Sequence, residues 1–250
     1  MKIDITGDCY VVGDIHGDAL VLADLFSVYD IKDCTLILLG DVGIWKYRDY
    51  KRYTYLDKAA IERNIMIYAF RGNHDNPAFF AVNDDSSPIL KRFWDKFTNF
   101  KVLPDLTVLN VNGNSGIVIG GALSIDRPFR KSFVRGKRNS AKFYNNDDWW
   151  FGENLPSTRN IDEKFDFILT HTGPRPPKIR PLNADNCSFF ILDPTLTDAV
   201  IAEEQRLDEI YEQFKPKKWW FGHFHINESF NYKQARCCTV DILNFSPLQM

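Results

Sequence analysis

The stretch Tyr10-Val11-Val12-Gly13-Asp14-Ile15-His16 starts as a short apolar run and ends in two side chains that can bind a metal ion. The same order, an apolar run followed by a potential metal ligand, recurs at 36–41, 67–75, 167–171 and 219–225. Such short apolar runs predict buried strands, so each ligand would follow the carboxyl end of its strand. Because ligands bind at that end of open α/β sheets, we expect the five loops to converge on one crevice.

The segments between these runs have helical patterns in the first third of the chain, and this alternation indicates βαβ units. The predicted strands are 9–13, 35–40, 65–71, 165–170, 218–221 and 235–245, and the predicted helices are 18–29, 51–63 and 194–214. The runs 107–111 and 116–120 are joined by Asn112-Gly113-Asn114, which predicts an antiparallel hairpin. The fold class is therefore α/β with an antiparallel component.

The composition limits the class of protein. A chain of 250 residues with 44% hydrophobic residues predicts a single globular domain over 1–250, and a net charge of −2 argues against a protein that wraps nucleic acid over its whole surface. Five cysteines with no Cys-x-x-Cys spacing favour a reduced compartment. Since neither a secretory signal nor a membrane-spanning run is recognisable, we expect a cytoplasmic protein without membrane contact.

All five histidines lie at the predicted strand ends. A single histidine is best explained as a buried imidazole with a hydrogen-bonding neighbour, but five in this arrangement indicate a metal site. The candidate ligands are Asp14, His16, Asp41, Asn73, His171, His223 and His225. Imidazole, carboxylate and amide groups without cysteine exclude a structural thiolate zinc site, and seven ligands exceed the needs of one ion. Two adjacent divalent ions would carry excess positive charge and attract a phosphate group.

Five ordered motifs resemble those of the calcineurin-like metallophosphoesterases. They are Asp14-Ile15-His16, Gly40-Asp41, Gly72-Asn73-His74-Asp75, His171 and Gly222-His223-Phe224-His225. The resemblance implies a four-layer α/β/β/α sandwich with a dinuclear metal site at the carboxyl ends of the strands. It also implies two divalent ions, with manganese as the first choice and iron, zinc, nickel or cobalt as alternatives that suit the same ligands.

The resemblance also implies a role for each site residue. Asp14, His16 and His225 would hold one ion, Asn73, His171 and His223 the other, and Asp41 would bridge the two. A hydroxide between the metals is the implied nucleophile. His74 would be the catalytic residue that donates a proton or a hydrogen bond to the leaving oxygen, with Asp75 as a candidate to orient it.

One departure and one further match narrow the branch of the family that the sequence resembles. In the Ser/Thr protein phosphatase branch the second motif reads G-D-x-V-D-R-G, whereas here Gly40-Asp41 is followed by Val42-Gly43-Ile44-Trp45. The acidic residue and the arginine of that motif are thus missing, and we do not expect protein phosphatase activity. Residues 120–127 resemble a Gly-Gly-Ala-x-Ser-x-Asp-Lys/Arg block of bacterial and phage members, in which a Trp-Trp pair and an acid follow, as Trp149-Trp150 and Glu153 do here.

The segment 127–142 holds seven basic residues and no acidic one, interleaved with phenylalanines. It predicts a basic flap or insert at about 127–148, and two interpretations stay open. The flap could grip phosphates or a single-stranded nucleic acid, or it could be a solvated surface loop. Arg127, Arg130 and Arg71 are the candidate substrate contacts.

The sequence thus predicts a metal-dependent phosphoesterase that hydrolyses phosphate mono- or diesters of a small phosphorylated substrate or a nucleotide. The alternative is a nuclease-like phosphodiesterase acting on nucleic acid or cyclic nucleotides, which the basic segment would favour. A non-catalytic metal-binding scaffold is a third hypothesis, and the retention of every candidate ligand together with His74 argues against it. The sequence does not determine the oligomeric state.

Overall fold

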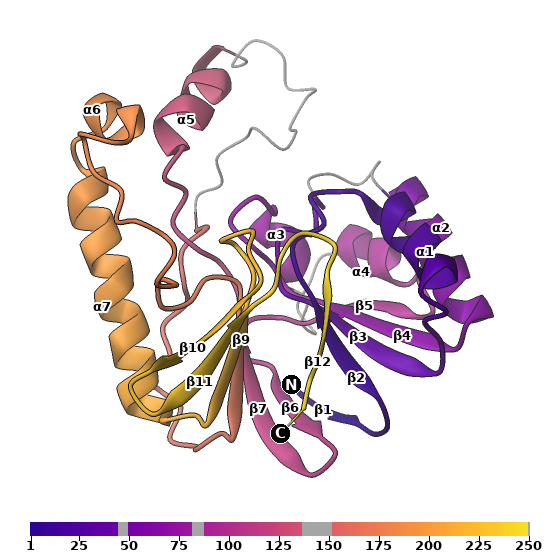
Figure 1. Ribbon diagram of the computed structural model, residues 1–250. Coiled ribbons are helices and arrows are strands. Elements are labelled where there is room, and N and C mark those ends of the chain that lie inside the picture. The colour runs from indigo at the N-terminus through magenta and orange to yellow at the C-terminus, as the bar shows by residue number, and fades with distance from the viewer. Residues whose placement is uncertain (45–49, 82–87, 137–151, 250) are drawn as a thin grey trace.

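The computed structural model describes residues 1–44, 50–81, 88–136 and 152–249. Two β-sheets face each other, and helices cover the outer side of each sheet (Figure 1). The first sheet has five strands in the order β12-β2-β3-β4-β5, and the second has seven in the order β1-β6-β7-β8-β9-β11-β10. This is the predicted four-layer α/β/β/α sandwich.

The bounds of the elements are as follows. The helices are α1 (Ala19–Val28), α2 (Tyr50–Glu62), α3 (Pro77–Phe80), α4 (Pro88–Trp94), α5 (Arg127–Gly136), α6 (Ser188–Leu192) and α7 (Leu196–Phe214). The strands are β1 (Lys2–Ile5), β2 (Cys9–Val12), β3 (Cys34–Leu38), β4 (Ile65–Ala69), β5 (Phe100–Val102), β6 (Val108–Val111), β7 (Asn114–Ile119), β8 (Phe167–Thr170), β9 (Lys218–Phe221), β10 (Glu228–Tyr232), β11 (Ala235–Thr239) and β12 (Phe245–Pro247). Within the described residues no helix is both long and apolar enough to cross a bilayer.

Parallel pairing brings the candidate loops to one edge of each sheet. In the five-stranded sheet β2, β3 and β4 run parallel, and in the seven-stranded sheet β8 and β9 do. The central strand β3 is buried along its whole length, as its uninterrupted apolar run requires. The predicted hairpin is confirmed as the antiparallel pair β6 and β7.

Three apolar clusters fill the spaces between the four layers. Side chains from both sheets, among them Ile37 and Leu169, form the central cluster. A second cluster lies between the five-stranded sheet and α1, α2 and α4, and a third joins the seven-stranded sheet to α7. Trp219 belongs to the third cluster and Trp220 to the central one, so this tryptophan pair packs in the core.

The prediction of one final strand over 235–245 is wrong. The segment forms β11 in the seven-stranded sheet, turns at 240–244, and continues as β12 in the five-stranded sheet. Leu243 has a positive φ of 54° in this turn, and its N–H donates to the carbonyl of Asp14. Alternating apolar residues predicted a strand but could not reveal that the chain changes sheets beside the candidate site.

The basic segment 127–142 is only partly described. Its first ten residues form helix α5, and 137–151, which include Trp149-Trp150, lie outside the described residues. Within the described part, Arg130 is buried rather than solvated. The expected flap is therefore a helix with one buried arginine where the structure describes it.

Candidate metal centre

Loops from both sheets form the candidate centre. Asp14 and His16 follow β2, Asp41 follows β3, and Asn73 with His74 follows β4. From the opposite sheet, His171 follows β8, and His223 with His225 follows β9. The five loops are thus brought together at the carboxyl ends of parallel strands, which is where polar groups from separate strands can converge.

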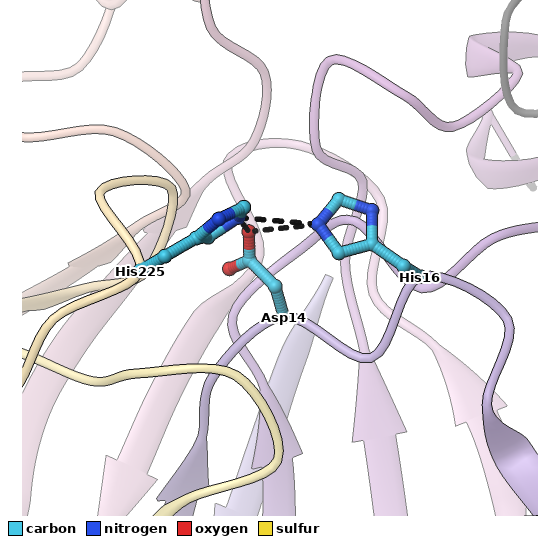
Figure 2. Close-up of side chains that lie close together, drawn as sticks. All are labelled: Asp14, His16 and His225. Atoms are coloured by element: carbon cyan, nitrogen blue, oxygen red, sulfur yellow. Dashed lines mark hydrogen bonds and ion pairs between the residues drawn. The ribbon is translucent and has the colours of Figure 1, made fainter.

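One group consists of Asp14, His16 and His225, whose side chains point toward one another (Figure 2). The Oδ2 atom of Asp14 lies 2.9 Å from Nε2 of His225 and 3.6 Å from Nε2 of His16. The two Nε2 atoms are themselves only 3.2 Å apart. Two imidazole nitrogens and a carboxylate oxygen that converge in this way match the ligands of a divalent transition metal.

A second group forms around His171. Its Nδ1 donates to the carbonyl of Leu39 at 2.7 Å, which leaves Nε2 with its lone pair when the ring is neutral. That Nε2 lies 2.9 Å from Oδ1 of Asn73 and 3.3 Å from Oδ1 of Asp41. Three acceptor atoms that face one another need a cation or a proton between them, so the donor set fits a metal ion.

Asp41 lies between the two groups. Its Oδ1 is next to His171, and its Oδ2 is 3.9 Å from Nε2 of His16. The backbone N–H of His74 donates to Oδ1 at 2.8 Å and fixes the carboxylate. This placement supports the bridging role that the resemblance implies for Asp41.

Two glycines, Gly72 and Gly222, allow the loops of the centre to approach one another closely. A Cβ on Gly72 would lie 2.1 Å from Oδ1 of Asp41, and a Cβ on Gly222 would lie 2.2 Å from Oδ1 of Asp14. Both contacts are far shorter than real Cβ atoms tolerate. The absence of a side chain at these two positions therefore leaves room for the carboxylates of the centre.

Four of the candidate ligands adopt the left-handed backbone conformation. The φ angles are 43° at His16, 44° at Asp41, 65° at His223 and 51° at His225. This region costs a non-glycine residue about 1 kcal/mol or more, and such residues cluster at functional sites. The surrounding hydrogen bonds, such as the one from the His223 N–H to Oδ1 of Asp14 at 3.0 Å, hold the strained loops in place.

The carboxylates of the centre shift the pKa values of its histidines. Burial disfavours the charged form of His171, but the carboxylates of Asp41 and Asp14 outweigh this effect and raise its pKa to about 9. The hydrogen bond to Asp14 likewise raises the pKa of His225. His223 behaves differently, because burial and the neighbouring His171 lower its pKa to about 3. Two buried carboxylates that hold protons on nearby histidines would also attract metal cations.

Asp75 ties two loops of the centre together. Its carboxylate accepts hydrogen bonds of 2.7–3.1 Å from the backbone N–H groups of Gly72, Val42, Gly43 and Ile44. Burial and the nearby Asp41 raise the pKa of Asp75 to about 6. These bonds join the loop after β3 to the loop after β4, and the orientation of His74 by Asp75 stays a prediction.

The imidazole of His74 lies at the edge of the centre. Its ring centroid is 5.3 Å from that of His16, and its Nδ1 lies 3.4 Å from Nη1 of Arg130. Arg130 also forms ion pairs with Asp126 and Glu153, each at 3.1 Å. The structure thus places the guanidinium of Arg130 next to Nδ1 of the His74 ring.

The other two arginines that the sequence singled out are also paired. Arg71 forms an ion pair with Asp105 at 2.8 Å and donates to the carbonyls of residues 152–154. Arg127 forms an ion pair with Asp193 at 2.9 Å. Their roles as substrate contacts stay predictions.

A cavity of about 340 Å³ adjoins the centre and is lined by Asp41, Asn73, His74, His223 and His225 on one side. Apolar side chains form much of the remaining wall, among them Leu123, Ile125, Ile179, Val200, Leu207 and Phe224. Its volume lies at the lower end of the range for small-molecule sites.

Sequence reasoning did not name two residues that lie at the site, Ser124 and Glu203. Ser124 accepts a hydrogen bond of 2.8 Å from Nδ2 of Asn73, and this turns Oδ1 of Asn73 toward His171. Glu203 on α7 lines the cavity and accepts a hydrogen bond of 2.5 Å from the N–H of Leu123. The block at 120–127 signalled Ser124, whereas no local pattern distinguishes Glu203 from the other acids of its helix.

A comparison with known protein families finds a match over most of the chain. A family model described as calcineurin-like phosphoesterase matches residues 9–227. No curated protein matches the sequence significantly.

Several solved structures are similar to the chain over nearly its full length. The phosphopantetheinyl hydrolase of Mycobacterium tuberculosis is 14% identical over 95% of this chain and 90% of its own, with a TM-score of 0.46. A protein serine/threonine phosphatase of Saccharomyces cerevisiae is 17% identical over 96% and 70%, with a TM-score of 0.38. The NAD nucleotidase of Haemophilus influenzae is 11% identical over 94% and 44%, with a TM-score of 0.40. The family match, which covers most of the chain, decides the assignment: the protein belongs to the calcineurin-like phosphoesterase family.

Proposed function

We propose that the protein hydrolyses phosphate esters of small molecules with two divalent metal ions bound at the candidate centre. The observation that carries this proposal is the set of potential metal-ligand atoms that face one another, with Nε2 of His171 only 2.9 Å from Oδ1 of Asn73 and Nε2 of His16 only 3.2 Å from Nε2 of His225. Asp41 lies between these two pairs.

Each candidate ligand, and His74, would have a definite role in catalysis. Asp14, His16 and His225 would hold one ion, Asn73, His171 and His223 the other, and Asp41 both. Divalent ions in such a site supply an activated water nucleophile and neutralise charge on the phosphoryl oxygens. His74, which lines the cavity beside them, would donate a proton or a hydrogen bond from its ring to the leaving oxygen.

The cavity indicates the kind of ester. Its apolar wall would bind the organic part of the substrate, while the phosphate would lie against the metal ligands at its other side. A phosphate ester with an apolar alcohol portion therefore suits the site. Arg127 and Arg71 are each engaged by a carboxylate, which favours such a small ester over an extended nucleic acid.

The experiment that tests the proposal compares hydrolysis of p-nitrophenyl phosphate and bis-p-nitrophenyl phosphate by the manganese-loaded protein, with Asp41→Asn as the blank. Metal-dependent hydrolysis of either ester supports the proposal, and the preferred ester separates a phosphatase from a phosphodiesterase. A wild-type rate equal to that of Asp41→Asn on both esters, despite bound metal, would contradict it.

A further inference from the structure

A buried polar chain connects two residues of the centre. The Nδ2 of Asn73 donates to Oγ of Ser124 at 2.8 Å, and Ser124 donates to Oε2 of Glu153 at 2.7 Å. Nη2 of Arg130 pairs with the same Oε2 at 3.1 Å, while Nη1 of Arg130 lies 3.4 Å from Nδ1 of His74. The chain thus runs from a candidate metal ligand to the candidate proton donor that follows it in the sequence.

The charged members of this chain are fully enclosed. Arg130 is 0% exposed and Glu153 is 2% exposed. Burying an ion pair costs desolvation energy that its mutual attraction barely recovers, so such a pair is weak evidence for a purely stabilising role. The cation is balanced by Asp126 at 3.1 Å as well as by Glu153, which fixes the guanidinium from two sides.

The chemistry of arginine determines which ring nitrogen of His74 carries the proton. A guanidinium has only donors, so a hydrogen bond between Arg130 and Nδ1 of His74 requires a lone pair on Nδ1. In the neutral imidazole the proton then resides on Nε2, at the opposite side of the ring.

We propose that Arg130 is a positioning residue that holds His74 in the Nε2–H form and, through Glu153 and Ser124, turns Oδ1 of Asn73 toward the metal centre. The effect on catalysis rests on the proposed function, because only a phosphoesterase needs Nε2–H of His74 as a hydrogen-bond donor to the leaving oxygen. This role differs from the direct substrate contact that the sequence predicts for Arg130. A fully buried side chain acts on the substrate through His74.

The first test observes His74 directly. Nitrogen-15 NMR of the imidazoles distinguishes the two tautomers, and the signals of His74 are those lost in His74→Ala. The wild type is expected to show Nε2–H with an Nδ1 that accepts a hydrogen bond, and Arg130→Met is expected to shift the Nδ1 signal of His74. The matched control is Arg63→Met, since Arg63 donates to the carbonyl of Ile31 and to Ser27 on α1.

The second test asks whether Arg130 acts through His74. The rate of hydrolysis is measured for a series of aryl phosphate esters whose leaving phenols differ in pKa. Loss of a hydrogen-bond donor to the leaving oxygen slows poor leaving groups most, so Arg130→Met is expected to lose about 10- to 100-fold with the poorest leaving group and only a few-fold with the best. The slope of log rate against leaving-group pKa should be the same for Arg130→Met and His74→Ala. The variant with both substitutions should lose little more activity than either single variant.

Several results would overturn the proposal. They are Nδ1–H in the wild type, a His74 signal unchanged in Arg130→Met, an equal loss for every leaving group, or losses that multiply in the double variant. If Arg130→Met fails to fold, Arg130→Lys keeps the charge but not the planar donor pair, and it is subject to the same criteria. Absence of esterase activity in the wild type would refute the proposed function, while the NMR result still decides the contact between Arg130 and His74.

Discussion

The Oδ1 atom of Asn73 lies 2.9 Å from Nε2 of His171, although both are acceptors when the imidazole is neutral. The Nδ1 proton of His171 is already donated to the carbonyl of Leu39, and the amide nitrogen of Asn73 is engaged by Ser124. The pair is therefore compatible only with a positive species between the two atoms. A proton and a metal ion compete for this position.

That competition predicts a pH dependence of metal binding. The pKa of His171 is raised to about 9, so below that pH the ring carries a proton that a metal ion must displace. Affinity should rise with pH between about 6.5 and 9, by up to tenfold per unit from this one group. Calorimetric titration with manganese in buffers of different ionisation enthalpy measures the proton released, and release of none at pH 7.5 would be inconsistent with this view.

Asp41→Asn should lower metal occupancy and hydrolysis together. The carboxylate of Asp41 approaches histidines of both groups, and an amide supplies neither its charge nor its second acceptor. Metal content per chain after gel filtration is the measurement. Asp57→Asn is the matched control, because Asp57 is also buried but accepts from the backbone of Thr98 and Asn99. Equal metal content in the two variants would count against the bridging role.

His74→Ala should slow hydrolysis without weakening metal binding. His74 lines the cavity, and its backbone N–H, which the alanine variant keeps, is the group that holds Asp41. We expect unchanged metal content and a rate about 10²-fold lower. Parallel measurement of metal content and of the rate with p-nitrophenyl phosphate checks this, and a fully active variant would rule out His74 as the proton donor.

The apolar wall of the cavity predicts a dependence on the organic part of the ester. In a series of n-alkyl phosphates, kcat/KM should rise about two- to threefold per added methylene until the cavity of about 340 Å³ is filled. Val200→Asp, which places a charge on the cavity wall formed by α7, should abolish this increase of kcat/KM with chain length and leave kcat/KM of the shortest ester unchanged. A wild-type gradient that is flat would show that the cavity does not bind the alcohol portion.

Glu203→Gln should stabilise the protein at alkaline pH. Burial raises the pKa of Glu203 from 4.5 to about 7, so the folded state holds a proton that the unfolded state releases between these values. This contribution to stability is present below pH 4.5 and lost as the pH rises through 7. Glu203 keeps partial solvent contact, which limits the size of the effect. The free energy of unfolding of Glu203→Gln should therefore exceed that of the wild type by about 1–2 kcal/mol at pH 8 and by less at pH 5. Urea unfolding at both pH values measures this difference, and equal stability of the two proteins at pH 8 would contradict the raised pKa of Glu203.

The strands that carry the centre were predictable because their signals are local. An apolar run that ends in glycine and a polar residue describes a strand end within fewer than ten residues, as at Tyr10–His16. The convergence of the loops then follows from parallel pairing of β2, β3 and β4. The candidate ligands could therefore be named from the sequence alone.

The remaining features depend on contacts between distant parts of the chain. Nothing local to Arg130 indicates that Glu153 will enclose it, since the pair forms only when two segments pack together. The turn at 240–244 is equally hidden, because its hydrogen bonds reach back to Gly13 and Asp14. Side-chain pairing and sheet changes of this kind are decided by tertiary packing rather than by periodicity.

The most direct test of the central claim, a dinuclear metal centre that hydrolyses phosphate esters, is the rate of hydrolysis as a function of metal added per chain. Metal-stripped protein is titrated with manganese while p-nitrophenyl phosphate and its bis-ester are hydrolysed. The account predicts a rate that rises to a plateau at about two equivalents and does not rise in Asp41→Asn. Hydrolysis that is independent of added metal, or absent at every loading, would contradict it.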